Sequence, residues 1–167
     1  MKSDMIRQWT NVVAFVGMLV VNYLSNALPF NDLTATMISD QFDIFFVPAG
    51  YAFSIWGLIY LGLLAFVIYQ ALPAQRENPR LRSIGYWFAV SCAANIAWLF
   101  LWHYDQLPWS LLLMVTLLAS LIVIYLRLGT GRTKTTPSES WFIRLPFSLY
   151  MGWISVATIA NATQLLD

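Results

Sequence analysis

Charged residues are scarce in this chain: 10% of its 167 residues are Asp, Glu, Lys or Arg, whereas 59% are apolar and 16% aromatic. A soluble globular domain has about 25% charged residues, so this composition cannot cover a water-facing surface. The nine Lys and Arg residues form no basic stripe along which phosphates could bind. A soluble fold is therefore excluded, and nucleic acid is not expected as a partner.

Cysteine and histidine occur once each, as Cys92 and His103. A single cysteine excludes an internal disulfide framework and a Cys-x-x-Cys metal site, so we expect no metal and no required cofactor. No Ser-His-Asp or paired-carboxylate arrangement can be built inside the apolar segments, and a conventional hydrolase or redox enzyme is not expected. We expect His103, beside Asp105, to be an exposed interfacial residue; ligation of a haem iron or proton transfer is the alternative.

Long apolar segments dominate what the sequence does contain. A helix needs roughly 17–25 residues to cross about 30 Å of hydrocarbon, and only helices satisfy their own backbone groups there. Five segments are long enough, and Arg127 at one extreme end is the single charged residue or histidine within them: 9–28, 51–72, 84–102, 108–128 and 145–166. The sequence thus predicts an all-α membrane protein with one domain, residues 1–167, forming a five-transmembrane-helix bundle.

The charges in the connectors separate by side. All nine basic residues fall in the N-terminal tail and at the second and fourth connectors, whereas Asp32, Asp40, Asp43, Asp105 and Asp167 fall on the other side. The positive-inside rule then predicts a cytoplasmic N-terminus and an outside C-terminus. We expect an inner or plasma membrane location, and an organelle membrane is the alternative. A second interpretation is that residues 1–27 resemble a signal peptide, whose cleavage would leave four helices.

The first and the fourth connectors differ in amino-acid composition. Residues 29–48 mix apolar residues with three aspartates and are too apolar for a solvated linker, so we expect a lid or interfacial helix over the outer mouth of the bundle. Residues 129–140 are rich in Gly, Thr and Ser, which is typical of a flexible loop.

Small residues recur at every fourth position of the third segment. Such a ladder permits close contact between helices, either within the chain or across a homodimer. It consists of Gly85, Ala89, Ala93 and Ala97. A second stripe on the opposite side of the same segment carries Ser91, Asn95, Trp98 and Trp102.

Aromatic and amide side chains follow single stripes in three further segments. The first segment has Asn22 and Asn26. The second has Phe53, Trp56 and Tyr60, with Tyr51 near its start. The fifth has Tyr150, Trp153, Ala157, Asn161 and Gln164. When depth in the membrane is counted from the segment ends, most of these side chains lie in the outer half. This predicts an aromatic-walled pocket that opens outward. Each aromatic residue taken alone also suits core packing. Tryptophans at segment ends are expected to form an interfacial belt: Trp9, Trp87, Trp102 and Trp109.

Three motifs resemble the TspO/MBR family, the tryptophan-rich sensory or translocator proteins. They are PAGYAFSIWGLIY at residues 48–60, NIAW at residues 95–98 and WISVATIAN at residues 153–161. The resemblance covers all five segments in order. The chain departs from the family pattern in having Ala49 after Pro48, Tyr51 as the first aromatic residue, one residue fewer before Trp56, and no basic residue in the C-terminal sterol motif.

The resemblance implies a binding protein for porphyrins, haem and related tetrapyrroles, and in some members sterol-like lipids. The family pocket faces outward under the first connector, many members are homodimers, and some promote light-dependent porphyrin breakdown. Transferred to this sequence, the pocket residues are Tyr51, Phe53, Trp56, Tyr60, Asn95, Trp98, Trp153, Ala157 and Asn161. Asn22, Asn26 and Tyr150 are additional candidates from their spacing.

We therefore expect a receptor or sensor for a flat hydrophobic ligand, in contact with membrane lipids. The alternative is a structural or assembly subunit whose aromatic faces pack against a larger membrane complex. A small-molecule transporter is the third interpretation, although the segments lack the charges and broken helices typical of transporters.

Overall fold

The computed structural model describes residues 2–28, 30–32, 37–38 and 50–166, and these are helical with no β-strand. The predicted all-α class is therefore confirmed. The long helices are α1 (Lys2–Ala27), α3 (Ile55–Ala71), α5 (Trp87–His103), α6 (Leu107–Arg127) and α8 (Leu145–Leu166). The shorter elements are α4 (Pro79–Ile84), α7 (Pro137–Glu139), 3-10 turns at Phe30–Asp32, Gly50–Ser54 and Pro73–Gln75, and a π turn at Ser140–Arg144.

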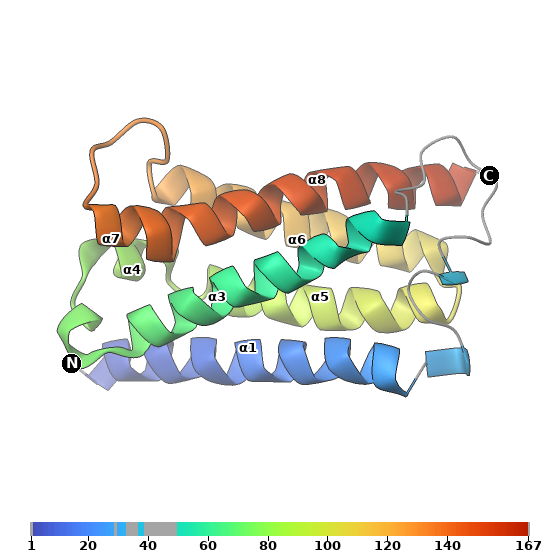
Figure 1. Cartoon of the computed structure of the whole chain (residues 1–167), viewed down its shortest axis with the longest axis horizontal. Helices are drawn as coiled ribbons and strands as arrows, with labels where there is room; N and C mark the ends of the chain where they lie inside the picture. Colours follow the sequence, from blue (N-terminus) through green and yellow to red (C-terminus); the bar gives the residue numbers. More distant parts are fainter. Residues whose placement is uncertain (1, 29, 33–36, 39–49, 167) are drawn as a thin grey trace.

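The long helices form a closed bundle in which each packs against two others. Going around the bundle, the order is α1, α5, α6, α8, α3 and back to α1. Figure 1 shows α3 crossing the front of the bundle diagonally, whereas the other long helices run along its length. Helix α1 begins at the end of the bundle that carries α4 and α7, and α8 ends at the opposite end (Figure 1). We call these the basic end and the opposite end.

Membrane-crossing length is reached by most of these helices. In the described part of the chain, four helical stretches are long and apolar enough to cross a membrane: Lys2–Ala27, Gly50–Ala71, Leu107–Arg127 and Pro137–Leu166. Helix α5 is apolar but has 17 residues, which corresponds to about 25 Å at 1.5 Å per residue. Five crossings, and the side on which each terminus lies, stay predictions.

Helix α5 begins later than predicted because the backbone turns at Gly85. Gly85 has φ +61°, a left-handed conformation that glycine adopts without steric strain and that ends α4. It therefore lies outside the helix that carries Ala89, Ala93 and Ala97. Ala93 is exposed and the other two alanines are half-buried. A role of this ladder in helix packing or in a homodimer stays a prediction.

Helix α1 turns its polar stripe toward the bundle interior. Its exposed side chains include Ile6, Trp9, Val13 and Tyr23, which suits contact with lipid tails. Its buried residues are Asp4, Arg7, Gln8, Asn11, Phe15, Met18, Asn22 and Ser25. Because no water is available in the hydrocarbon, these polar groups must find partners on neighbouring helices.

Four phenylalanines fill the interior between α1, α3, α5 and α8. Phe15, Phe66, Phe88 and Phe147 are at most 1% exposed. Their ring centroids lie 4.8–6.4 Å apart, mostly edge to face, which is a favoured aromatic geometry. This phenylalanine cluster separates the basic end of the interior from the opposite end.

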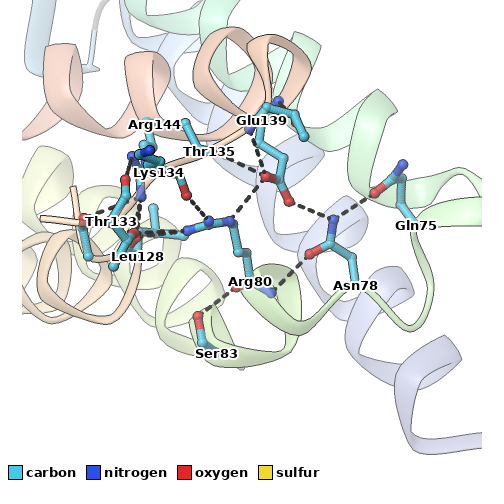
Figure 2. A network of polar contacts seen from close by, with 12 residues as sticks. Gln75, Asn78, Arg80, Ser83, Leu128, Thr133, Lys134, Thr135, Glu139 and Arg144 are labelled. Carbon is cyan, nitrogen blue, oxygen red and sulfur yellow. Dashed lines mark hydrogen bonds and ion pairs between the residues drawn. The ribbon is translucent and has the colours of Figure 1, made fainter. Parts of the chain in front are cut away.

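Polar contacts fasten the loop at residues 129–140 to the basic end (Figure 2). Arg80 Nε donates to Glu139 Oε2 at 3.1 Å, and Arg144 donates to the carbonyl oxygens of Leu128 at 3.0 Å and Thr133 at 2.7 Å. We call Arg80, Thr133, Glu139 and Arg144 the clasp. These charged side chains satisfy the carbonyls where α6 ends. The flexibility of the loop stays a prediction.

Candidate functional site

Two adjoining cavities lie inside the bundle toward the opposite end. One lies between α3, α5 and α8, the other between α1, α3 and α5, and their volumes are about 40 and 140 Å³. Both are lined by Phe53, Trp56, Trp98 and Trp102. We call the two together the aromatic cavity. Since ligand pockets typically have volumes of about 300–1,000 Å³, a drug-sized occupant has to move the rings apart.

Stacked ring pairs on two helices form the walls of the aromatic cavity. Trp56 and Tyr60 on α3 stack with centroids 5.4 Å apart and planes at 21°, and Trp98 and Trp102 on α5 stack at 5.2 Å and 16°. Each pair is four residues apart, so both rings project from one helix face. Trp153 on α8 meets Trp56 edge-on, with centroids 6.3 Å apart and planes at 83°. The cavity is therefore lined by aromatic rings from α3, α5 and α8.

Hydrogen bonds between helices hold these walls in place. Trp102 Nε1 on α5 donates to Gln164 Oε1 on α8 at 2.9 Å, and Ser110 Oγ on α6 donates to Asn161 Oδ1 on α8 at 2.9 Å. On the other side, Asn22 Nδ2 on α1 donates to Asn95 Oδ1 on α5 at 2.8 Å. Such bonds fix the rotation of α5 and α8 about their axes and so orient the rings.

Most of the residues predicted for the pocket line this cavity. They come from α1, α3, the turn before α3, α5 and α8: Asn22, Asn26, Phe53, Trp56, Tyr60, Trp98, Trp153, Ala157 and Asn161. The structure thus brings together stripes that lie far apart in the sequence. Their role in ligand binding stays a prediction.

Three predicted residues do not line the cavity. Tyr51 is 84% exposed, on the outside of the turn before α3. Asn95 is fully buried and supports the wall through Asn22. Tyr150 is also fully buried, with its ring edge against Trp56 at 6.1 Å.

Trp102 lines the cavity, whereas the sequence analysis placed it both on the stripe with Trp98 and in an interfacial belt. The prediction that it belongs to an interfacial belt is wrong, because it is 5% exposed and bonded to Gln164. Its position four residues after Trp98 was the signal that could have identified it. Trp9 and Trp109 are 66% and 61% exposed, as expected of belt residues, and Trp87 is half-buried beneath Arg127. Gln164, predicted on the stripe of the fifth segment, also lines the cavity, and further lining residues that the prediction lacked are Ser25, Leu99 and Ala160.

His103 is also placed differently from the prediction. It is 2% exposed, so the expectation of an exposed interfacial histidine is wrong. Its Nδ1 donates to the carbonyl oxygen of Leu99 at 2.8 Å, and its ring meets Phe30 edge-on. In the described part of the chain, no group of three or more His, Cys, Asp or Glu residues is arranged to hold a metal ion.

The first connector is described only in part. Phe30 stacks on Phe100 of α5 at 4.9 Å, and Asn31 Nδ2 donates to the carbonyl oxygen of His103 at 3.3 Å. The start of the connector therefore lies against the last turns of α5. Residues 29, 33–36 and 39–49 lie outside the described residues, and with them most of the predicted lid.

Comparison with known proteins identifies the family. The sequence matches the TSPO-like protein family over residues 8–167, which is nearly the whole chain. No curated protein and no solved structure matches it. The family match and the apolar helices together make the chain a multi-pass integral membrane protein of the binding or sensor type. The chain belongs to the TSPO-like protein family.

Proposed function

We propose that the aromatic cavity binds a flat hydrophobic ligand of the porphyrin class, and that this binding is the sensory function of the chain. The observation that carries the proposal is the pair of ring stacks, Trp56 with Tyr60 and Trp98 with Trp102, on facing sides of one interior space. A planar macrocycle gains most from such a site because stacking uses its whole face. Sterol-like lipids share the apolar character but lack the extended π-system.

The small volume of the cavity indicates how such a ligand would enter. The space of about 40 and 140 Å³ is too small for a macrocycle unless rings separate. Helix α3 carries Trp56 and Tyr60 and follows a turn whose Tyr51 is exposed. We infer that the ligand inserts by displacing the α3 rings from those of α5.

The packing of the bundle interior agrees better with ligand binding than with ligand transport. The phenylalanine cluster fills the bundle between the cavity and the basic end, with Phe66 and Phe147 at most 1% exposed and 4.8 Å apart. A transporter would need this cluster to open at every cycle. A ligand that enters and leaves from the same end needs no such movement.

Porphyrin titration tests the proposal. Protoporphyrin IX is added to the protein in nanodiscs, with empty nanodiscs as the reference, and binding is followed by the porphyrin absorbance band. The site variant is Trp98→Ala/Trp153→Ala. The matched control is Trp9→Ala/Trp109→Ala, which removes the same number of indoles from exposed positions.

We expect wild type and control to bind with the same affinity and the site variant to bind at least tenfold more weakly, provided that circular dichroism shows an unchanged helix content. Equal binding by the site variant and wild type would overturn the proposal. Tyr51→Ala should bind like wild type, because its ring is 84% exposed and outside the cavity.

A further inference from the structure

Two indole N–H groups at the aromatic cavity have no acceptor. Nε1 of Trp98 and Nε1 of Trp153 are both buried and make no hydrogen bond within the described residues. The two side chains are 7% and 9% exposed, and both line the cavity between α3, α5 and α8. A buried donor without an acceptor lowers stability, so native proteins keep few of them.

Two side-chain oxygens that line the cavity beside Trp98 and Trp153 already accept hydrogen bonds from other groups. Gln164 Oε1 accepts from Trp102 Nε1 at 2.9 Å and from Asn161 Nδ2 at 3.4 Å. Asn161 Oδ1 accepts from Ser110 Oγ at 2.9 Å. Neighbouring side chains therefore leave the Trp98 and Trp153 donors free. Deeper in the wall, Asn95 Nδ2 is a third buried donor without an acceptor.

The cavity also has no charge to offer a ligand. No Lys, Arg, His, Asp or Glu is among the described residues that line either space. The basic residues near the interior, such as Arg80 and Arg144, lie in the clasp at the other end of the bundle (Figure 2). An ionised carboxylate placed beside Trp98 and Trp153 would be desolvated without a counter-ion, which is strongly unfavourable.

We propose that Trp98 and Trp153 select a ligand that carries an uncharged hydrogen-bond acceptor, such as an ester, ketone or ether oxygen. This inference rests on the proposed function, because it specifies the chemistry of the ligand that enters the same cavity. Stacking on the rings accepts any flat macrocycle. The two indole donors then distinguish macrocycles by the groups at their edge.

Three porphyrins with the same ring and different edges test this selection. Etioporphyrin carries alkyl groups alone, protoporphyrin IX dimethyl ester carries neutral acceptors, and protoporphyrin IX carries carboxylates. The affinity of each is measured for the protein in nanodiscs and corrected for partitioning into empty nanodiscs. We expect the dimethyl ester to bind roughly tenfold more tightly than etioporphyrin and also more tightly than the free acid, from one or two hydrogen bonds.

The variant Trp98→Phe/Trp153→Phe removes both donors and keeps an aromatic ring at each position. We expect it to lose the preference for the ester over etioporphyrin, with any loss of affinity from the smaller rings the same for both porphyrins, while the control Trp9→Phe/Trp109→Phe keeps that preference. Equal binding of ester and etioporphyrin by wild type, preference for the free acid, or a preference that survives in the variant would overturn the inference. Failure of all three porphyrins to bind would instead overturn the proposed function.

Discussion

The clasp and the aromatic cavity treat their buried polar groups in opposite ways. In the clasp, the Nη atoms of Arg144 donate to the carbonyl oxygens of Leu128, Gly129 and Thr133, and only its Nε lacks a partner. In the cavity, Trp98 and Trp153 each have one polar atom, and neither atom has a partner within the described residues. Paired groups stabilise a fold and unpaired groups destabilise it. The comparison indicates that the clasp serves stability, and it agrees with our proposal that the cavity binds a ligand.

Removing the central cation of the clasp should have the largest effect on stability. Arg144 is 8% exposed and satisfies carbonyl oxygens at the end of α6. Arg144→Met keeps an unbranched apolar stem but removes the guanidinium that donates to these oxygens, so we expect the free energy of unfolding to fall by about 2–4 kcal/mol. The measurement is reversible unfolding in mixed micelles of mild detergent and dodecyl sulfate.

The matched control for this variant is Arg132→Met, in the same loop, where the side chain is exposed. It should change the free energy of unfolding by less than about 0.5 kcal/mol. If Arg144→Met and Arg132→Met had the same small effect, the clasp would not stabilise the bundle. The contrast between the clasp and the aromatic cavity would then not hold for the clasp.

Removing the unpaired donors should have a smaller effect on stability. Trp98→Phe/Trp153→Phe loses some ring packing, but it also removes two N–H groups that have no acceptor. These two contributions oppose each other, so we expect the free energy of unfolding to change by less than about 1 kcal/mol per site. A loss as large as that of Arg144→Met in the same unfolding assay would show that the indoles are structural.

The amide pair behind the cavity should give the smallest effect. Asn22 Nδ2 donates to Asn95 Oδ1 at 2.8 Å between α1 and α5. A double-mutant cycle with Asn22→Ala and Asn95→Ala should give a coupling free energy of about 0.6 kcal/mol, the average for hydrogen bonds between membrane helices. A coupling of zero would mean that this bond does not help to position the cavity wall.

Periodicity predicted the cavity better than it predicted the ends of the helices. Trp56 and Tyr60, and likewise Asn22 and Asn26, share a helix face by spacing alone, and the structure places these faces on one interior space. Hydrophobic length also located the helices, with α8 beginning and ending at the predicted residues Leu145 and Leu166.

The errors in predicted exposure arose at helix ends. There, exposure was predicted from the position of a residue along its segment, and the rotation of the helix about its own axis was not considered. Trp102 and His103 stand at the end of a helix, where exposure is common, but α5 is rotated so that both face the protein. The contacts that hold the loop before α7 were also missed, since Arg80 reaches this loop from a distant part of the sequence and Arg144 reaches it from the segment that follows. Neither helix rotation nor such long-range polar contacts can be deduced from local pattern.

The central claim is that the Trp98 and Trp153 donors bind a neutral acceptor on the ligand. Indole N–H resonances of protein labelled with ¹⁵N-tryptophan test it most directly, with assignments from single Trp→Phe variants. Etioporphyrin and protoporphyrin IX dimethyl ester impose similar ring-current shifts, so their difference isolates hydrogen bonding. The account predicts that the indole protons of Trp98 and Trp153 lie further downfield with the ester than with etioporphyrin, while those of Trp9 and Trp109 do not differ. Identical positions of the Trp98 and Trp153 resonances with both bound porphyrins would contradict it.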